Sequence, residues 1–247
     1  MASSVTPTVP PVCTVLLRIS PDGRGPLLVG AIRDEFVERP WEPPAFHWDA
    51  PYAGLIGGRD QRAGGTWLAV DPAARAVAAL LNAGKRDDPE DGVPRPTRGT
   101  LALQILTPEG LPEDMTRYDR FHLLRATLGG GELWSWDGDT IVHTRLEPGD
   151  HIIVNAGLDA QDDPLVPHFT PLLEGTPSEV DPWRKLLEGD GLDPGDDRAL
   201  VVRKEIEGHD YGTTSGSLLA LSPDAVRYEF TATPGDPGSW FEVDTGS

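Results

Sequence analysis

CTVLLRIS at residues 13–20, followed by PDGRGP at 21–26 and LLVGAIR at 27–33, is the stretch that decides the fold. Its two runs are apolar and rich in β-branched residues, and the segment between them is dense in turn formers. This pattern predicts an antiparallel β-hairpin near the start of the chain.

The predicted hairpin gives the only cysteine charged neighbours. If Ser20 pairs with Leu27 across the turn, then Cys13 lies opposite Asp34 and beside Arg33, since partners in an antiparallel pair are counted in opposite directions. The alternative is a purely structural role, in which Cys13 is a small buried side chain and the charged residues form salt bridges at the end of a strand.

Other elements follow from composition and spacing. Residues 36–63 are rich in Pro, Trp and Gly without a period and predict a long loop near a site. A second hairpin is expected over 66–70 and 77–82, with a helix over the Ala-rich 73–81 as the alternative. The charged, Pro-rich segment 86–98 predicts a loop.

The rest of the chain alternates short apolar runs with turns. A meander that begins a second sheet is expected at 121–128, 132–136, 140–144 and 151–155. Later strands are expected at 199–206, 216–221 and 225–232. Helices are expected at 99–107 and 113–120, and from Ser178, as a cap, to Glu188. Residues 159–178 and the acidic 189–197 should be loops.

Composition excludes several classes of function. The net charge of −19 opposes binding to nucleic acid and to anionic lipid surfaces. One cysteine excludes an internal disulfide framework and favours a reducing, cytoplasmic location. No stretch has the length and hydropathy of a membrane span or signal peptide. The excess of arginine over lysine, with abundant Ala, Gly and Pro, suggests a GC-rich bacterial genome.

The length predicts a single domain. We expect residues 1–12 to be a disordered extension or to precede the true start of the chain, 13–235 to form the domain, and 236–247 to be a polar tail that frays. The 28 glycines and 25 prolines predict a folded protein with many turns.

Several motifs resemble the NRDE family, the relatives of transport and Golgi organization protein 2. The motif Ile32-Arg33-Asp34-Glu35-Phe36, followed by Arg39-Pro40, is similar to that family's Asn-Arg-Asp-Glu-Phe and its nearby Arg-Pro. The segments 64–68 (GGTWL) and 78–82 (AALLN) match in order and spacing. Weaker similarities are 155–156 (NA), 182–186 (PWRKL) and 211–213 (YGT). The sequence departs from the family at Ile32, and at Thr214, where relatives usually carry Arg.

The resemblance implies an α+β fold, a four-layer αββα sandwich of two mainly antiparallel sheets, as in N-terminal-nucleophile hydrolases. It also implies an amidohydrolase-type site acting on an unknown small amide. The residues expected to be catalytic are Cys13, Arg33, Asp34, Asn82 and Asn155. Those expected to bind substrate are Glu35, Trp67 and Gly65. Arg33 would favour the thiolate, Asp34 would orient an amine, and the two asparagines would donate to an oxyanion.

Such catalysis sets a condition on the N-terminus. In these hydrolases the α-amine of the cysteine acts as the base, because its pKa lies close to working pH, whereas an acylated nitrogen cannot accept a proton. Twelve residues precede Cys13, so the hypothesis requires a processed or shorter chain. Two routes are cleavage after Val12, or initiation at a GTG codon for Val12 and loss of the initiator Met.

Other readings remain open. A non-catalytic carrier of heme or another lipophilic metabolite would use Trp41, Trp48 and Trp67 to line an apolar pocket, although core packing explains them equally well. A third reading is a family member that has lost its chemistry. The six histidines show no zinc spacing, but heme can use one as an axial ligand. The pair Gly64-Gly65 indicates a backbone bend rather than a phosphate cradle. No cofactor is required.

Overall fold

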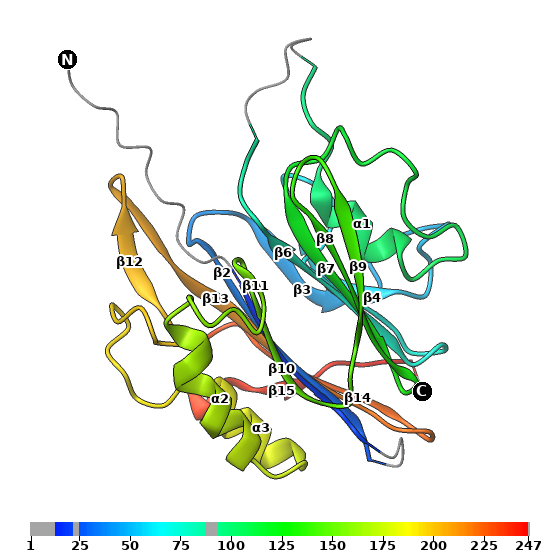
Figure 1. The fold of residues 1–247 in the computed structure, drawn as a ribbon. Helices are drawn as coiled ribbons and strands as arrows, with labels where there is room; N and C mark the ends of the chain where they lie inside the picture. The colour runs from blue at the N-terminus through cyan, green and yellow to red at the C-terminus, as the bar shows by residue number, and fades with distance from the viewer. Residues whose placement is uncertain (1–12, 22–24, 87–92, 247) are drawn as a thin grey trace, which may run out of the picture.

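Two antiparallel sheets, packed face to face, form the centre of the computed structural model (Figure 1), which describes residues 13–21, 25–86 and 93–246. In the first sheet the strand order is β11-β10-β1-β2-β13-β14-β15, and β12 pairs with β13. In the second sheet the order is β3-β4-β5-β6-β7-β8-β9. Neighbours in the second sheet are consecutive in sequence, whereas the first sheet collects strands from both halves of the chain.

The bounds of the strands show how the chain is divided. The first sheet contains β1 (Thr14–Ile19), β2 (Leu27–Phe36), β10 (Gly149–Val154), β11 (Gly157–Leu158), β12 (Arg203–Ile206), β13 (His209–Leu221), β14 (Val226–Thr231) and β15 (Phe241–Glu242). The second contains β3 (Trp41–Ala45), β4 (Ile56–Asp60), β5 (Leu68–Asp71), β6 (Ala76–Asn82), β7 (Phe121–Thr127), β8 (Gly130–Trp136) and β9 (Ile141–Leu146).

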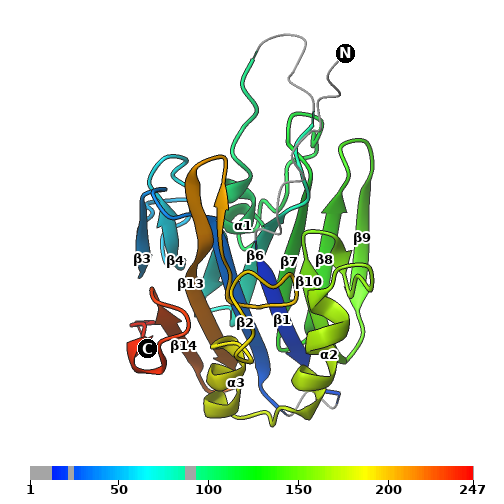
Figure 2. The same ribbon diagram turned by 90° about the vertical axis from the view of Figure 1, so that its left-hand side faces the viewer.

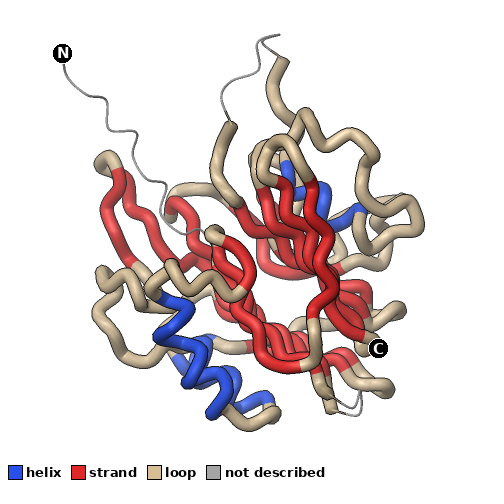
Figure 3. The backbone as a smooth tube through the Cα atoms, in the orientation of Figure 1, coloured by secondary structure: helices blue, strands red, loops and turns tan. Residues whose placement is uncertain are grey.

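Helices cover the outer faces of both sheets (Figures 2 and 3). The first sheet carries α2 (Leu165–Gly175) and α3 (Val180–Leu187), and the second carries η1 (Arg98–Thr100) and α1 (Leu101–Gln104). A short turn, η2 (Pro237–Ser239), precedes β15. The layers therefore run helix, sheet, sheet, helix, which confirms the predicted αββα sandwich. None of the described helices is long and apolar enough to cross a membrane.

Alternation along the strands separates the cores. In β1, Val15 and Leu17 point into the core between the sheets, while Leu16 points to the helices α2 and α3. In β2, Val29 packs in the inner core and Ile32 in the helix-side core. Because successive residues of a strand face opposite sides, a strand buried on both faces is apolar throughout.

The first hairpin forms as predicted, but its register differs by one residue. Thr14 pairs with Ile32, so that continuing the ladder by one residue places Cys13 opposite Arg33, not opposite Asp34. Partners in an antiparallel pair share a face. The cysteine and the arginine side chains therefore lie on the same face of the sheet, and Asp34 lies on the other.

The turn explains the altered register. Ser20 lies outside the ladder, and its hydroxyl accepts a hydrogen bond from the backbone N–H of Gly25 at 3.1 Å. The side chain thereby closes the turn, and β1 ends one residue earlier than a pairing of Ser20 with Leu27 requires. Side chain to backbone bonds of this kind are common for serine in turns.

The predicted loop over 36–63 is wrong, because it contains β3 and β4. Two prolines, Pro43 and Pro44, argued against a strand in the sequence, so β3 was not predicted. They are tolerated because β3 is the edge strand of its sheet and its ladder is irregular between Glu42 and Ala45. The second hairpin is confirmed as β5 and β6, and the helical alternative over 73–81 is not adopted.

The predicted meander is also corrected. The strands β7, β8 and β9 extend the sheet of β5 and β6 instead of beginning another, and β10 crosses to pair with β1. Residues 159–178, predicted as loop, contain α2 in spite of Pro171. Residues 113–120 form turns rather than a helix.

The C-terminal half brings smaller corrections. The helix predicted after Ser178 is α3, and Glu179, not Ser178, is its N-cap residue. The strand predicted over 199–206 is limited to β12, and β13 begins well before residue 216. Residues 241–242 pair with β14, so this part of the C-terminal segment does not fray. The expectations for residues 1–12 and 87–92 lie outside the described residues.

Candidate active site

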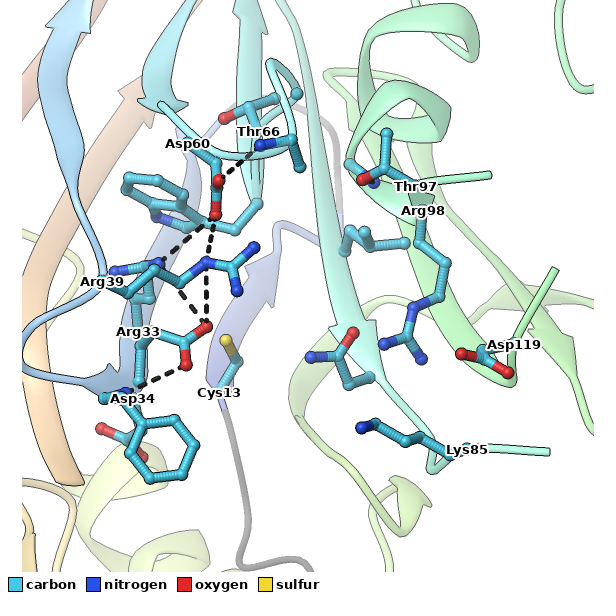
Figure 4. A pocket seen from close by; sticks show the side chains of 18 of the residues that line it. Cys13, Arg33, Asp34, Arg39, Asp60, Thr66, Lys85, Thr97, Arg98 and Asp119 are labelled. Atoms are coloured by element: carbon cyan, nitrogen blue, oxygen red, sulfur yellow. Dashed lines mark hydrogen bonds and ion pairs between the residues drawn. The ribbon is translucent and has the colours of Figure 1, made fainter. Parts of the chain in front are cut away.

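A pocket of about 620 Å³ opens between the sheets, at the end of the sandwich where β1 begins and β2 and β6 end. Figure 4 shows that Cys13, Arg33, Asp34, Arg39 and Asp60 lie on one side of it, and Lys85, Arg98 and Asp119 on the other. We call the first group the cysteine wall. The second group, with Arg95, also a lining residue, is the far wall.

The thiol of Cys13 belongs to the cysteine wall of the pocket. It is buried, and burial, the Asp34 carboxylate and Glu35 together raise the pKa of the thiol to about 12, although Arg33 and a hydrogen bond from the Asp34 backbone lower it. Arg33 acts in the expected direction, since it lowers the pKa of the thiol, but desolvation outweighs the guanidinium and the pKa stays raised. A neutral thiol needs a base to become a nucleophile.

Cys13 lies at the start of β1 with Arg33 of β2 beside it. Asn155 lies in the tight turn that joins β10 to β11, directly after the strand that pairs with β1. The side-chain oxygen of Asn155 is buried without a hydrogen-bond partner among the described residues. Buried polar atoms are rarely left without partners outside functional sites.

Arg33 is held at the centre of a buried polar network. Its Nη1 donates to the hydroxyl of Thr214 at 2.9 Å, and its guanidinium lies 4.3 Å from the ring centre of Trp67. Its Nη2 lies 3.7 Å from Glu35 and 3.9 Å from Asp60. The side chain is only 5% exposed, so its orientation is fixed by these partners.

Asp34 points away from Arg33 and accepts a hydrogen bond from the hydroxyl of Thr213 at 2.7 Å. Burial raises the pKa of this carboxyl to about 7, in spite of the Thr213 bond and the cations Arg203 and Lys204, which lower it. A carboxyl that titrates near neutral pH beside the start of β1 suits a role in proton transfer or in orienting an amine.

We expect Asp34 to make stability depend on pH. Its pKa is higher in the folded chain than in an unfolded one, so between about pH 4 and pH 7 the folded state binds more protons, and the free energy of unfolding falls as pH rises. Over this pH range the free energy of unfolding should fall by at most roughly 4 kcal/mol. Urea unfolding from pH 4 to 8 should show a steeper fall for the wild type than for Asp34→Asn. Parallel curves would contradict this assignment.

Two residues of the cysteine wall were missed by the sequence analysis as site residues. Arg39 donates through Nε to Asp60 at 2.5 Å and lies 3.5 Å from Glu35. Asp60 also accepts bonds from the backbone of Arg62 and Ala63, and its pKa is lowered by Arg39 and these N–H groups, although burial opposes this. The Arg39-Pro40 motif could have indicated Arg39 as a site residue. No motif indicated Asp60, because it lay in a segment that was predicted to be a loop.

The pair Gly64-Gly65 shapes the roof of the pocket. Gly64 has a φ of +73°, which glycine adopts without strain, and Gly65 lies against the backbone of Gly99. The Thr66 N–H donates to the Gly99 carbonyl at 3.0 Å. The segment is thus a backbone bend, as the sequence indicated, and it packs against η1, the short helix before α1.

A methyl group at position 65 should destabilise the fold. A Cβ there would lie 2.5 Å from the carbonyl carbon of Gly99, which is backbone and cannot rotate away. We expect Gly65→Ala to lower the free energy of unfolding by about 1 to 3 kcal/mol, measured by urea denaturation. Gly175→Ala is the matched control, because nothing lies within 4 Å of its Cβ. Equal stability of the two variants would refute the proposed close contact.

The far wall carries most of the cations across from Cys13. Arg98 donates through Nη1 to the carbonyls of Arg120 at 2.6 Å and Gly84 at 3.3 Å. Arg95 lies 3.1 Å from Asp119. Asn82, at the end of β6, also lines the pocket. None of the far-wall residues was predicted from sequence, because they come from loops without a recognisable motif.

The predicted site residues are largely brought together. Around this pocket the structure places Cys13, Arg33, Asp34, Glu35, Gly65, Trp67 and Asn82. Asn155 does not line it and lies in the turn between β10 and β11. Of the tryptophans considered for an apolar pocket, Trp41 and Trp48 are not lining residues. Within the described ranges, no group of three acidic, histidine or cysteine residues is arranged to hold a metal ion.

The two departures from the family motifs have structural explanations. Ile32 points to the helix side and is 2% exposed in the core against α2 and α3, so it does not face the pocket. Thr214 occupies a bulge in β13 and accepts the hydrogen bond from Arg33. The hydroxyl thus belongs to the network that holds the arginine beside Cys13.

A sequence model of the family called Transport and Golgi organisation 2 matches residues 12–192, which is most of the chain. The chain belongs to this family. The match includes Cys13, the Arg33-Asp34-Glu35 segment, Asn82 and Asn155, and so covers every residue predicted to be catalytic in this family member. No curated protein sequence matched the chain.

Solved structures agree on the fold. Penicillin V acylase from Agrobacterium tumefaciens superposes with a TM-score of 0.53 and 12% identity, covering 95% of this chain and 87% of the acylase. The N-acylethanolamine-hydrolyzing acid amidase orthologue of Caenorhabditis elegans gives a TM-score of 0.52 and 11% identity, covering 94% and 100%. At such identities the likeness shows the fold, which is that of N-terminal-nucleophile hydrolase-like proteins.

Proposed function

We propose that this protein is an amidohydrolase of the N-terminal-nucleophile type that acts on a small amide, with Cys13 as its nucleophile once its α-amine is free. The observation that carries the proposal is the position of the only thiol. It lies in a polar pocket beside Arg33, with Asp34 next along β2.

The chemistry follows from the state of the thiol. Because burial keeps Cys13 protonated, a base must stand beside it, and a free α-amine on the same residue supplies one. The amine takes the thiol proton as the sulfur attacks the amide carbon. It then returns the proton to the leaving amine, which leaves a thioester. Water, deprotonated by the same amine, attacks the thioester and releases a carboxylic acid and the thiol.

The neighbouring residues have distinct roles in this proposal. Asp34 orients the α-amine, and Arg33 opposes the effect of burial on the sulfur. The side-chain amides of Asn82 and Asn155 donate to the oxyanion of the tetrahedral intermediate, where preorganised donors act most strongly. Glu35 and Trp67 fix Arg33 from either side, and Gly65 shapes the roof.

The test compares two forms of the chain. One begins at Cys13, obtained by initiation with Met in place of Val12 and removal of that Met, and the other retains residues 1–12. Both are incubated with acyl p-nitroanilides of two to twelve carbons. We expect the form with a free Cys13 amine to show an acyl adduct by intact mass and to release p-nitroaniline. Cys13→Ala should abolish both signals, because the thioester cannot form.

Two outcomes would count against the proposal. Equal hydrolysis by both forms would show that the α-amine is not the base, and no adduct on either form would reject the nucleophile. N-terminal sequencing of the native protein adds an independent check, because the proposal expects Cys13 as the first residue. We place this chemistry in a reducing cytoplasm, where the thiol persists.

The carrier hypothesis makes a different prediction. Heme binding would give a Soret shift on titration, whichever residue acted as its axial ligand. Support for it is weaker, since no histidine lines the described pocket and Trp67 is the one tryptophan that does. An inert thiol with a retained extension and a Soret shift would favour the carrier.

A further inference from the structure

The two walls of the pocket differ in charge. The cysteine wall, with the neighbouring lining residue Glu35, carries Arg33 and Arg39 against Asp34, Glu35 and Asp60, and Glu207 in the turn after β12 is a further acidic lining residue. Among the described residues the far wall carries three cations, Lys85, Arg95 and Arg98, against the single acid Asp119. In a chain with a net charge of −19, the described residues thus place an excess of positive charge on one side of the pocket. A general need for solubility does not explain that placement.

Arg98 is the anchored member of the far wall. Both of its described hydrogen bonds leave from Nη1 and run to backbone carbonyls, so neither neutralises the guanidinium. Burial lowers the pKa of Arg98, and Asp119 only partly opposes this. An arginine that is partly desolvated and fixed by two carbonyls presents a pre-oriented fork to an anion, at little further cost in side-chain entropy.

Lys85 completes this surface. It is an exposed lining residue of the pocket, three residues after the end of β6, and lies on the same side as Arg98 in Figure 4. Asp119 lies 3.1 Å from Arg95, and among the described lining residues of the far wall it is the one acid for three cations.

We propose that the far wall, through Arg98 and Lys85, selects amides that carry an anionic group, a carboxylate or a phosphate, at the end away from the scissile bond. The inference rests on the proposed function, since it names the class of substrate for the same pocket. The amide carbonyl lies against Cys13, and the anion reaches across to the far wall. Leu80 and Trp67 line the space between and suit a short acyl chain.

The test measures binding to the full-length chain, so that it does not depend on turnover. The probes are two matched pairs of N-propyl octanamides that differ at carbon 8 of the acyl chain: the 8-carboxylate (the N-propyl monoamide of suberic acid) with its neutral primary amide, and the 8-phosphate with the neutral 8-hydroxy compound. Isothermal titration at low ionic strength should show each anion, or at least one of the two, binding about tenfold or more tightly than its neutral partner. The pair with the larger ratio identifies carboxylate or phosphate as the preferred group.

Charge-removing variants locate the effect. Lys85→Gln should reduce the anion preference about two- to fivefold, as expected for one exposed charge, and Arg98→Gln about tenfold or more, while affinity for the neutral probes stays unchanged. Lys185→Gln is the matched control, because it removes the same charge from an exposed position on α3, outside the pocket. Lys85 makes no hydrogen bond among the described residues, so Lys85→Gln should fold normally. It therefore tests the proposal even if Arg98→Gln folds poorly.

Equal binding of charged and neutral probes, or no binding of either anion, would overturn the inference. An anion preference that survives both far-wall substitutions, or that falls equally in Lys185→Gln, would also overturn it. Hydrolysis by the chain that begins at Cys13 is scored separately. Turnover without a preference for anions would support the proposed function and contradict this inference. A preference for anions without turnover would support the anion-binding surface and contradict the proposed function.

Discussion

Replacing Arg33 with methionine is expected to lower the free energy of unfolding by about 3 to 5 kcal/mol. The guanidinium lies between Glu35 and Asp60, whose side chains are 19% and 12% exposed, and its removal leaves these two poorly hydrated carboxylates sharing the single cation Arg39 among the described residues. Methionine restores the volume but none of the charge, and the hydroxyl of Thr214 also loses its donor. Urea denaturation at pH 7 measures the change.

Arg59→Met is the matched control for this prediction. Arg59 lies 3.9 Å from Glu42 in the second sheet, and both side chains are well exposed, at 44% and 38%. Exposed pairs contribute little, so the same substitution there should change stability by no more than about 0.5 kcal/mol. Similar losses at both positions would show that burial of the Arg33 network does not determine its importance.

The second large effect is expected on turnover. In the chain that begins at Cys13, Asn82→Ala and Asn155→Ala should each lower kcat about 10² to 10³-fold, with little change in KM, because each removes a donor that acts on the oxyanion. Asn82 lines the pocket at the end of β6, and Asn155, in the turn after β10, has a buried side-chain oxygen without a hydrogen-bond partner among the described residues. Steady-state kinetics with the acyl p-nitroanilides measures both.

A control separates donation from packing. Asn155→Asp keeps the shape of the side chain but cannot donate in its ionised form, so it should lose kcat as Asn155→Ala does while folding normally. Retention of full kcat by either alanine variant would remove that asparagine from the oxyanion site. A rise in KM with an unchanged kcat would instead indicate a role in substrate binding.

The parts of the fold that sequence predicts are those where local pattern and tertiary packing agree. The hairpin that became β1 and β2 is continuous in its apolar run, and both faces of it are buried. The strand β3 was not predicted, because its prolines are tolerated only in an edge strand, and a strand's position at the edge depends on the whole sheet. Likewise α2 contains Pro171, which local rules read as a helix breaker.

The site shows the same division. Cys13, Arg33 and Asp34 were predicted because a hairpin joins them, and family resemblance added Asn82 and Asn155. The one-residue error in register came from the turn, where the Ser20 hydroxyl binds the backbone of Gly25. The cations Arg95 and Arg98 were out of reach, because tertiary packing of loops, rather than spacing in sequence, brings them to the pocket.

The bulge at Thr214 has a consequence for how this strand can change. Upstream of it, Thr213 pairs with Asp34, and downstream Ser215 pairs with Arg33, so one extra residue separates the site half of β13 from its core half. Removing a single residue here would turn Leu219 and its neighbours to the opposite face, or else break the contact with Asp34. Substitutions at Thr214 are local changes, whereas a one-residue insertion or deletion between 211 and 221 would force a choice between an intact core and an intact pocket.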